Sequence, residues 1–94
     1  MNTLTKSALN TALAELDWEL NNNQLHRVYQ FPSYPQAAAF VQTLAEHAES
    51  VNHHPDLLLT WRKVSVWLTT HDVGGITALD TDFAHFANQS FQKQ

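Results

Sequence analysis

Residues 49–61 read Glu-Ser-Val-Asn-His-His-Pro-Asp-Leu-Leu-Leu-Thr-Trp, and this stretch contains the break in the chain that organises the rest of the fold. The residue before a proline is driven out of the helical region of backbone space, so a helix that reaches this stretch must end before Pro55. His54 is then extended, and the apolar run Leu57–Trp61 is typical of a strand. The stretch therefore predicts a helix followed by a strand, with two adjacent histidines at the junction between them.

A long amphipathic helix is expected upstream of this break. Ser33-x-x-Gln36 is typical of a capping box at a helix start, and Pro35 falls in the first turn, where its missing N–H costs little. The apolar positions that recur at helical spacing form one stripe, which we expect to lie on a sheet: Ala37, Phe40, Val41, Leu44, Ala48 and Val51.

The flanking sequence predicts two hairpins and two more helices. The expected elements are a helix over about 6–15, strands over 18–20 and 25–31 around a turn at 21–23, the central helix, strands over 57–61 and 64–70 around Arg62-Lys63, and a last helix after Thr77. This order predicts a single domain, residues 1–94, of the α+β class. We expect a four-stranded antiparallel sheet with helices packed on one face.

The last helix has a second capping box at its start. Thr77-x-x-Asp80 fits that pattern, and the inward side chains of the helix are expected to be Leu79, Phe83, Phe86 and Ala87. Residues 88–94 are polar, so we expect the end of the chain to fray.

The composition excludes several classes of protein. The 94 residues carry a net charge of −4 with only five lysines and arginines, so direct binding of nucleic acid is not expected. There is no cysteine, which excludes disulfides and thiolate zinc sites. No apolar run approaches the roughly 20 residues of a membrane-spanning helix, and the N-terminus does not show the pattern of a signal peptide. We expect a soluble, cytoplasmic protein with no membrane partner.

Histidines and carboxylates concentrate in the second half of the chain. His53, His54 and His71 lie between Glu49 and Asp80. An imidazole gives and takes protons near neutrality, because its unperturbed pKa is about 6.5. Adjacent side chains of an extended chain point to opposite faces. The rings of His53 and His54 can therefore hold a flat substrate from two directions, or one ring can transfer protons while the other holds the substrate.

Each of these residues also has a structural explanation. His53 and His54 could be polar loop residues at a helix end, and His71 a surface residue before a glycine loop. The capping box alone explains Asp80. Glu49 lies at the end of the central helix, where the helix dipole disfavours a carboxylate, so we expect it to have a partner such as a histidine.

A zinc site is the main chemical alternative. His53, His54 and His71 could supply three ligands and leave a fourth position open. Adjacent residues on an extended chain rarely turn both rings to one centre, so we expect no metal.

The remaining aromatic, basic and histidine residues have simpler interpretations. Trp18 and Trp61 are expected to pack in the core or on the sheet rather than against a ligand. Arg27 lies inside an alternating strand and is expected to pair with an acid. Three histidines are assigned to the surface: His26, His47 and His85.

The order and spacing of the site candidates resemble the pterin-4a-carbinolamine dehydratase family. The seven positions that carry the resemblance are Glu49-x3-His53-His54-Pro55-x5-Trp61-x9-His71-x8-Asp80. Four other segments look like the same family: the run ending at Trp18, Arg27–Tyr29, Val64–His71 and Gly75–Thr77. The resemblance extends from about Leu4 to Phe86, and a motif with a His-His-Pro triplet is far more specific than an isolated pair of histidines.

The resemblance implies the α+β fold, no metal and no cofactor. It also implies an activity, the loss of water from a 4a-hydroxytetrahydropterin to give the quinonoid dihydropterin. This step belongs to the recycling of the tetrahydropterin cofactor that aromatic amino-acid hydroxylases use. By the same resemblance His53, His54 and His71 are the catalytic residues, with His54 as the general acid.

Four residues are implied to contact or orient the substrate: Glu49, Asn52, Pro55 and Asp80. Glu49 would orient or charge one of the rings, because a nearby carboxylate favours imidazolium. Asp80 would hold a neighbouring histidine or a donor on the pterin. The sequence departs from the family at Asn52, where Asp is frequent, at Leu57, where an aromatic residue is common, and at Leu79, where a basic residue is common. These departures put the substrate affinity and the identity of the pterin in question.

The resemblance also implies two alternative functions. Some family members are dimerisation partners of a transcription factor, and a related fold could bind another pterin in molybdenum-cofactor metabolism. Family members form dimers or tetramers. We expect a homodimer or homotetramer here too, because the chain is small and its second hairpin has large apolar side chains on both faces.

Overall fold

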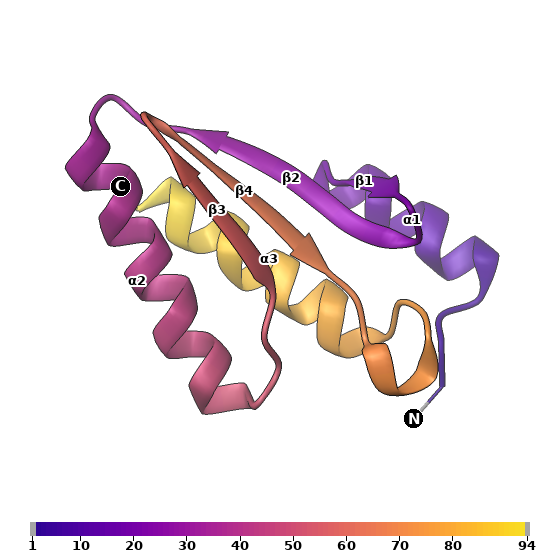
Figure 1. Ribbon diagram of the computed structural model, residues 1–94. Helices are drawn as coiled ribbons and strands as arrows, with labels where there is room; N and C mark the ends of the chain where they lie inside the picture. The colour runs from indigo at the N-terminus through magenta and orange to yellow at the C-terminus, as the bar shows by residue number, and fades with distance from the viewer. Residues whose placement is uncertain (1, 94) are drawn as a thin grey trace.

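The computed structural model describes residues 2–93. Its elements, in chain order, are α1 (Lys6–Leu16), β1 (Glu19–Asn21), β2 (Gln24–Gln30), α2 (Tyr34–Val51), β3 (Asp56–Thr60), β4 (Lys63–Leu68), a short 3₁₀ turn η1 (His71–Val73) and α3 (Ala78–Gln92) (Figure 1). This order confirms the predicted α+β class. Within the described residues, no helix has both the length and the apolar character needed to cross a membrane.

The four strands form one antiparallel sheet in the order β1-β2-β4-β3. The two central strands belong to different hairpins, and Tyr29 of β2 lies opposite Val64 of β4. The three helices lie on one face of the sheet, with α3 between α1 and α2 (Figure 1). The predicted layers are therefore confirmed, and β1 and β3 are the two edges of the sheet.

Alternation along β4 defines the face that the helices cover. Val64, Val66 and Leu68 are buried, while the residues between them are half-buried. The helices supply the other half of the core: Ala37, Phe40, Leu44 and Ala48 from α2, and Phe83, Ala84 and Ala87 from α3. The predicted stripe of α2 is thus confirmed as far as Ala48. Val51 does not belong to it, because its side chain is 42% exposed in the last turn of the helix.

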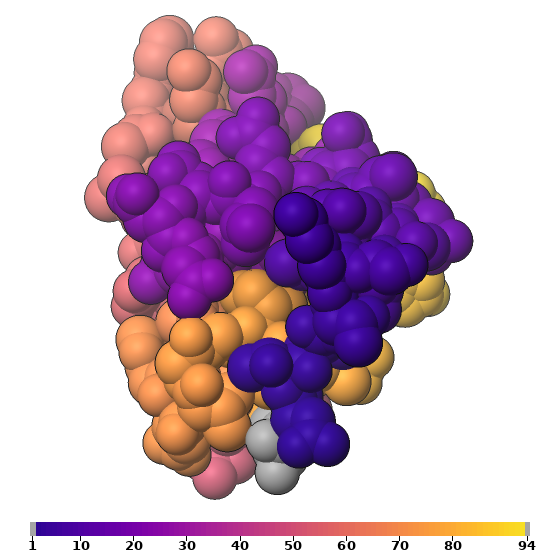
Figure 2. All heavy atoms as spheres, turned by 90° about the vertical axis from the view of Figure 1, so that its right-hand side faces the viewer, coloured from indigo at the N-terminus to yellow at the C-terminus, as the bar shows by residue number. Residues whose placement is uncertain are grey.

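The loop between β4 and α3 is held by the segment that precedes α1. The N–H of Leu4 donates to the carbonyl of Ile76 at 2.8 Å, and Figure 2 shows the N-terminal segment lying against this loop. Gly75 lies close to Thr3, since a Cβ at position 75 would lie 2.9 Å from Cγ2 of Thr3, which would have to move. The hydrogen bond and this close approach join the N-terminal segment to the loop that leads into α3.

Asn88 connects the last helix to the first hairpin. Its Oδ1 accepts hydrogen bonds from Trp18 Nε1 at 3.0 Å, from Arg27 Nη1 at 2.9 Å and from the Tyr29 hydroxyl. Its Nδ2 donates to the carbonyl of Leu16 at 2.8 Å. Burial raises the pKa of Tyr29 to about 12, so the hydroxyl stays protonated and remains a donor at neutral pH.

Two predictions about this region are wrong. Arg27 pairs with an amide and a carbonyl rather than with an acid. The end of the chain does not fray at residue 88, because α3 continues to Gln92. Phe91 lies in these last turns, and its ring is 4.9 Å from that of Tyr29 and 5.4 Å from that of Phe31.

Three aromatic side chains also differ from the prediction. Trp18 is buried as expected, but Trp61 is 71% exposed at the turn between β3 and β4. His26 and His47 are half-buried rather than on the surface. His26 stacks on Trp67 across the strands, and His47 stacks on Phe86 between α2 and α3. Desolvation lowers the pKa of His47.

Replacing Asn88 with Ala tests the role of this amide in the fold. The change removes the acceptor of three donors, two of which belong to the buried residues Trp18 and Tyr29. We expect the free energy of unfolding, measured by urea titration, to fall by about 2–4 kcal/mol, because each buried donor left unpaired costs about 1–3 kcal/mol. Asn10→Ala, at an exposed position of α1, is the matched control. Equal effects of the two changes would contradict this role.

Candidate functional site

A cleft of about 370 Å³ lies where the end of α2, the end of β4 and the start of α3 meet. Its walls are Asn52, His53, His54, Thr69, Thr70, His71, Asp72, Val73 and Leu79. The cleft brings together the three predicted histidines, although His71 is far from the other two in the sequence.

The end of α2 directs the two adjacent histidines. Asn52 caps the helix in the left-handed conformation with φ 51°, which asparagine tolerates better than most residues. The N–H of His53 donates to the carbonyl of Ala48 at 3.1 Å, and the chain then becomes extended before Pro55. His53 is buried and His54 exposed. The two side chains therefore face different surroundings, as expected for neighbours in an extended chain.

His53 bonds to a carboxylate that is completely buried. Its Nε2 lies 2.6 Å from Oδ1 of Asp80, whose exposed fraction is zero. The other oxygen, Oδ2, accepts from the hydroxyl of Thr70 at 2.8 Å and from the backbone N–H of Thr77 at 2.9 Å. A buried carboxylate is tolerated only when it is fully hydrogen-bonded, and this one has a donor on each side.

Asp80 also completes the predicted capping box of α3. Its side chain bonds to the backbone N–H of Thr77, and the Thr77 hydroxyl accepts from the first turn of the helix. The same carboxylate thus starts α3 and holds His53. The two explanations that the sequence left open for Asp80 are compatible in the structure.

His54 has a different partner. Its Nε2 is hydrogen-bonded to Oε2 of Glu49, in the last turns of α2. Both side chains are largely exposed, at 54% and 79%, so the pair adds little to stability. Its effect is to restrict the orientation of the His54 ring. Glu49 is therefore paired with a histidine, as predicted from the sequence.

The remaining predicted residues divide into two groups. His71 and Asn52 line the cleft, and His71 is exposed at the start of η1. Pro55 does not line it; it shapes the chain between His54 and β3. Glu49 and Asp80 do not line it either, and each acts on a histidine that does.

The sequence interpretation missed four residues of the cleft wall: Thr69, Thr70, Asp72 and Val73. The first two lie directly before His71, and Thr70 is 6% exposed. Two hydroxyls next to a candidate histidine at a strand end were the available signal. Their partners could not be seen, because the carboxylate that Thr70 bonds is ten positions further along the chain.

The three histidines do not converge on one point. Nε2 of His53 and Nε2 of His54 are each engaged by a different carboxylate. Among residues 2–93, no three histidine or acidic side chains are grouped as metal ligands. The arrangement is one of separate rings around a cleft, in which His53 and His54 are each held by a different carboxylate.

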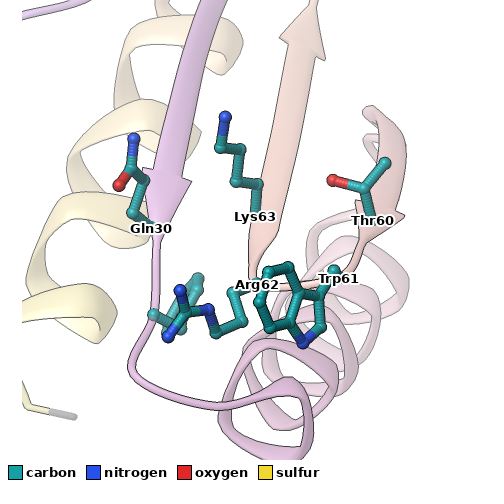
Figure 3. A pocket seen from close by; sticks show the side chains of 6 residues that line it. Gln30, Thr60, Trp61, Arg62 and Lys63 are labelled. Carbon is teal, nitrogen blue, oxygen red and sulfur yellow. The ribbon is translucent and has the colours of Figure 1, made fainter.

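A larger hollow of about 530 Å³ lies at the opposite ends of β3 and β4. It is lined by Gln30, Phe31, Thr60, Trp61, Arg62 and Lys63, and Figure 3 shows Arg62 beside the ring of Trp61. The guanidinium carbon lies 4.3 Å from the centre of that ring. The lining contains no histidine and no carboxylate, so it has no group that transfers protons near neutral pH. The histidine cleft is therefore the better candidate for acid–base chemistry.

Relatives with similar sequences carry the provisional name pterin-4-alpha-carbinolamine dehydratase. One, from Roseiflexus sp. (strain RS-1), is 48% identical over 67 residues, which cover 71% of this chain and 72% of that protein. Another, from Mycobacterium avium (strain 104), is 44% identical over 89 residues, covering 94% of this chain and 95% of the relative.

Solved structures share the fold. A protein from Brucella melitensis, described as a transcriptional coactivator/pterin dehydratase, matches with a TM-score of 0.89 and 34% identity over 94% of this chain and 97% of that chain. A pterin dehydratase-like protein identified as a RuBisCO assembly factor in the alpha-carboxysome matches with a TM-score of 0.65 over 77% of this chain and 83% of that one. At 22% identity, this second likeness concerns the fold alone.

The family comparison covers almost the entire chain. The sequence profile of the family described as Pterin 4 alpha carbinolamine dehydratase matches residues 2–90. That range includes every residue of the cleft and both carboxylates that hold its histidines. This chain belongs to the pterin-4a-carbinolamine dehydratase family.

Proposed function

We propose that this protein dehydrates 4a-hydroxytetrahydropterins to quinonoid dihydropterins by acid–base catalysis. The reaction would be one step in the recycling of tetrahydropterin cofactor for aromatic amino-acid hydroxylation. The observation that carries the proposal is the His53–Asp80 pair, at 2.6 Å, in a cleft that also holds His54 and His71. Membership of the family supports the same activity.

The reaction needs two proton transfers. One proton must reach the 4a-hydroxyl, so that the C–O bond breaks and water leaves. Another must be removed from the adjacent ring nitrogen, whose electron pair then forms the new C=N bond. Positioned acids and bases typically contribute about 10²–10⁴-fold to such a step. We assign the general acid to His54, whose ring Glu49 orients, and place His53 and His71 around the same substrate.

The cleft suits a flat bicyclic ring. Its volume of about 370 Å³ lies within the usual range for small-molecule sites. Val73 and Leu79 provide apolar wall, and Asn52 provides an amide at the rim. Leu79 and Asn52 are two of the positions at which the sequence departs from the family, so they would tune which pterin is bound rather than whether a proton is transferred.

A direct assay tests the proposal. Purified protein added to freshly generated 4a-carbinolamine should accelerate the appearance of quinonoid dihydropterin over the buffer rate. Dialysis against a chelator should not change that rate, because the acting groups are side chains. Absence of any acceleration would overturn the proposed function, and a loss of rate that zinc restores would assign the chemistry to a metal.

Removing the histidines one at a time should separate their roles. We expect His54→Ala to lower kcat by about 10²-fold, the loss of one positioned acid. His53→Ala and His71→Ala should do comparable damage, divided between kcat and KM. Combining two changes should cost less than the product of the single losses, because the groups act together. His85→Ala, on the exposed side of α3, is the control. Wild-type rates in all three site variants would exclude the cleft as the active site.

Asp80→Asn separates catalysis from helix capping. Asn keeps the shape of the side chain but places an NH₂ group among the three donors that now bond to Asp80. We therefore expect kcat to fall tenfold or more and the free energy of unfolding to fall by about 1–3 kcal/mol. Ser33→Ala, which removes the N-cap of α2, should cost about 0.5–2 kcal/mol and leave kcat unchanged. Thermal melts and rates are measured on both variants. A stability loss without a kinetic effect in Asp80→Asn would leave Asp80 as a cap only.

We also propose that the protein is a homodimer or homotetramer. Leu58 of the edge strand β3 is 50% exposed, and Val28 on the same outer face of the sheet is 40% exposed. Exposed apolar side chains that share a face are typical of an interface. Light scattering during gel filtration at micromolar concentration should give at least twice the monomer mass of 10.7 kDa. A monomer mass would contradict the assignment.

A further inference from the structure

Two buried threonines continue the hydrogen bonds that begin at His53. Thr70 follows β4, and Thr77 is the N-cap of α3; they are 6% and 0% exposed. Their hydroxyl oxygens are 2.8 Å apart, and that of Thr70 is also 2.8 Å from Oδ2 of Asp80. The backbone N–H of Leu79 reaches Oγ1 of Thr77 at 3.2 Å.

The direction of each bond follows from counting protons. An ionised carboxylate only accepts, so the single proton of the Thr70 hydroxyl points to Asp80. The bond between the two hydroxyls must then be donated by Thr77, whose oxygen accepts from the N–H of Leu79. On the other side of the carboxylate, Oδ1 lies 2.6 Å from Nε2 of His53. Since an ionised carboxylate only accepts, we assign the proton of this bond to Nε2. One consistent chain therefore runs from Leu79 through both threonines to Asp80, and Asp80 also receives His53.

This chain determines which nitrogen of His53 carries the proton. In a neutral imidazole one ring nitrogen donates and the other accepts. Since Nε2–H is committed to Asp80, Nδ1 is the nitrogen with the free lone pair. The Nε2–H tautomer of His53 depends on Asp80 remaining a hydrogen-bond acceptor. Asp80 remains an acceptor because its second oxygen, Oδ2, receives hydrogen bonds from the Thr70 hydroxyl and the Thr77 N–H.

We propose that Thr70 is a positioning residue: its hydroxyl, supported by Thr77, keeps Asp80 oriented as the acceptor for Nε2–H of His53 and so presents Nδ1 as the reactive nitrogen. The inference rests on the proposed dehydration for its catalytic consequence. Its structural part, the tautomer of His53, stands independently of that activity.

The hydroxyl of Thr70 is not needed to shape the loop. The backbone of the same residue already closes it, because its N–H donates to the carbonyl of Gly75 at 2.9 Å and its carbonyl accepts from Gly74 at 3.0 Å. Gly74 takes a φ of 67°, which is easily reached only by glycine. The side chain is therefore free to serve Asp80, and removing the hydroxyl alone should leave the loop in place.

The test compares Thr70→Val, which keeps the shape and removes the hydroxyl, with Thr70→Ser, which keeps the hydroxyl. Thr81→Val is the matched control, because the hydroxyl of Thr81 donates to the carbonyl of Ala78 in its own helix and, among residues 2–93, makes no other hydrogen bond. Two readouts are taken: kcat and KM for the carbinolamine, and the ¹⁵N chemical shifts of the His53 ring by NMR.

Thr70→Val should lower kcat at least about tenfold, part of the roughly 10²–10⁴-fold that a positioned acid or base supplies, with little change in KM. Its His53 ring should lose the ¹⁵N pattern of the Nε2–H tautomer. Thr70→Ser and Thr81→Val should resemble the wild type in both readouts. If Thr70→Val does not fold, the pair Thr70→Ser and Thr70→Ala makes the same comparison.

Two results would overturn the proposal. One is a wild-type kcat and tautomer in the variant without the hydroxyl. The other is an equal loss in Thr70→Ser, which would assign the effect to packing of the methyl group. If the wild-type protein does not dehydrate the carbinolamine, the proposed function fails, and the NMR comparison still decides whether Thr70 sets the tautomer of His53.

Discussion

The structure of this site depends on the burial of one carboxylate. Asp80 has no exposed surface, and a charge in that position is tolerated only if hydrogen bonds replace its water. The donors come from three parts of the chain: His53 after α2, Thr70 after β4, and the backbone of Thr77 at the start of α3. Satisfying this group requires the three segments to meet. The same meeting point creates the cleft.

The rest of the fold keeps these segments in register. α2 ends at Val51 because Asn52 turns left-handed and Pro55 prevents further helix. The contact of Leu4 with Ile76 and the close approach of Thr3 to Gly75 hold the loop before α3. At the far end of the same helix, Asn88 bonds to Arg27 and Tyr29 of β2. α3 is thus anchored at both ends, which fixes the position of Asp80 relative to His53.

Much of this arrangement could be predicted from local sequence signals. Helix periodicity, the caps at Ser33 and Thr77, and the break at Pro55 act over a few residues, so the three helices, the two hairpins and the end of α2 were predicted correctly. The strand predicted over 64–70 ends at Leu68, and the turn η1 was not predicted. The contacts that were missed join distant positions. Asn88 lies 70 residues from Trp18, and a single amide in a polar tail gives no sign of its partners. Burial of His47 against Phe86 and exposure of Trp61 likewise depend on how α2, α3 and the second hairpin are placed in three dimensions.

We propose that the histidine cleft, rather than the larger hollow beside Trp61, receives the pterin. A titration of ¹⁵N-labelled protein with a stable dihydropterin, followed by NMR, tests this claim most directly. We predict that the amide signals of residues 52–54, 69–73 and 79 shift, while those of Gln30 and residues 60–63 stay in place. Shifts confined to Gln30 and residues 60–63, or no shifts at all, would contradict the account.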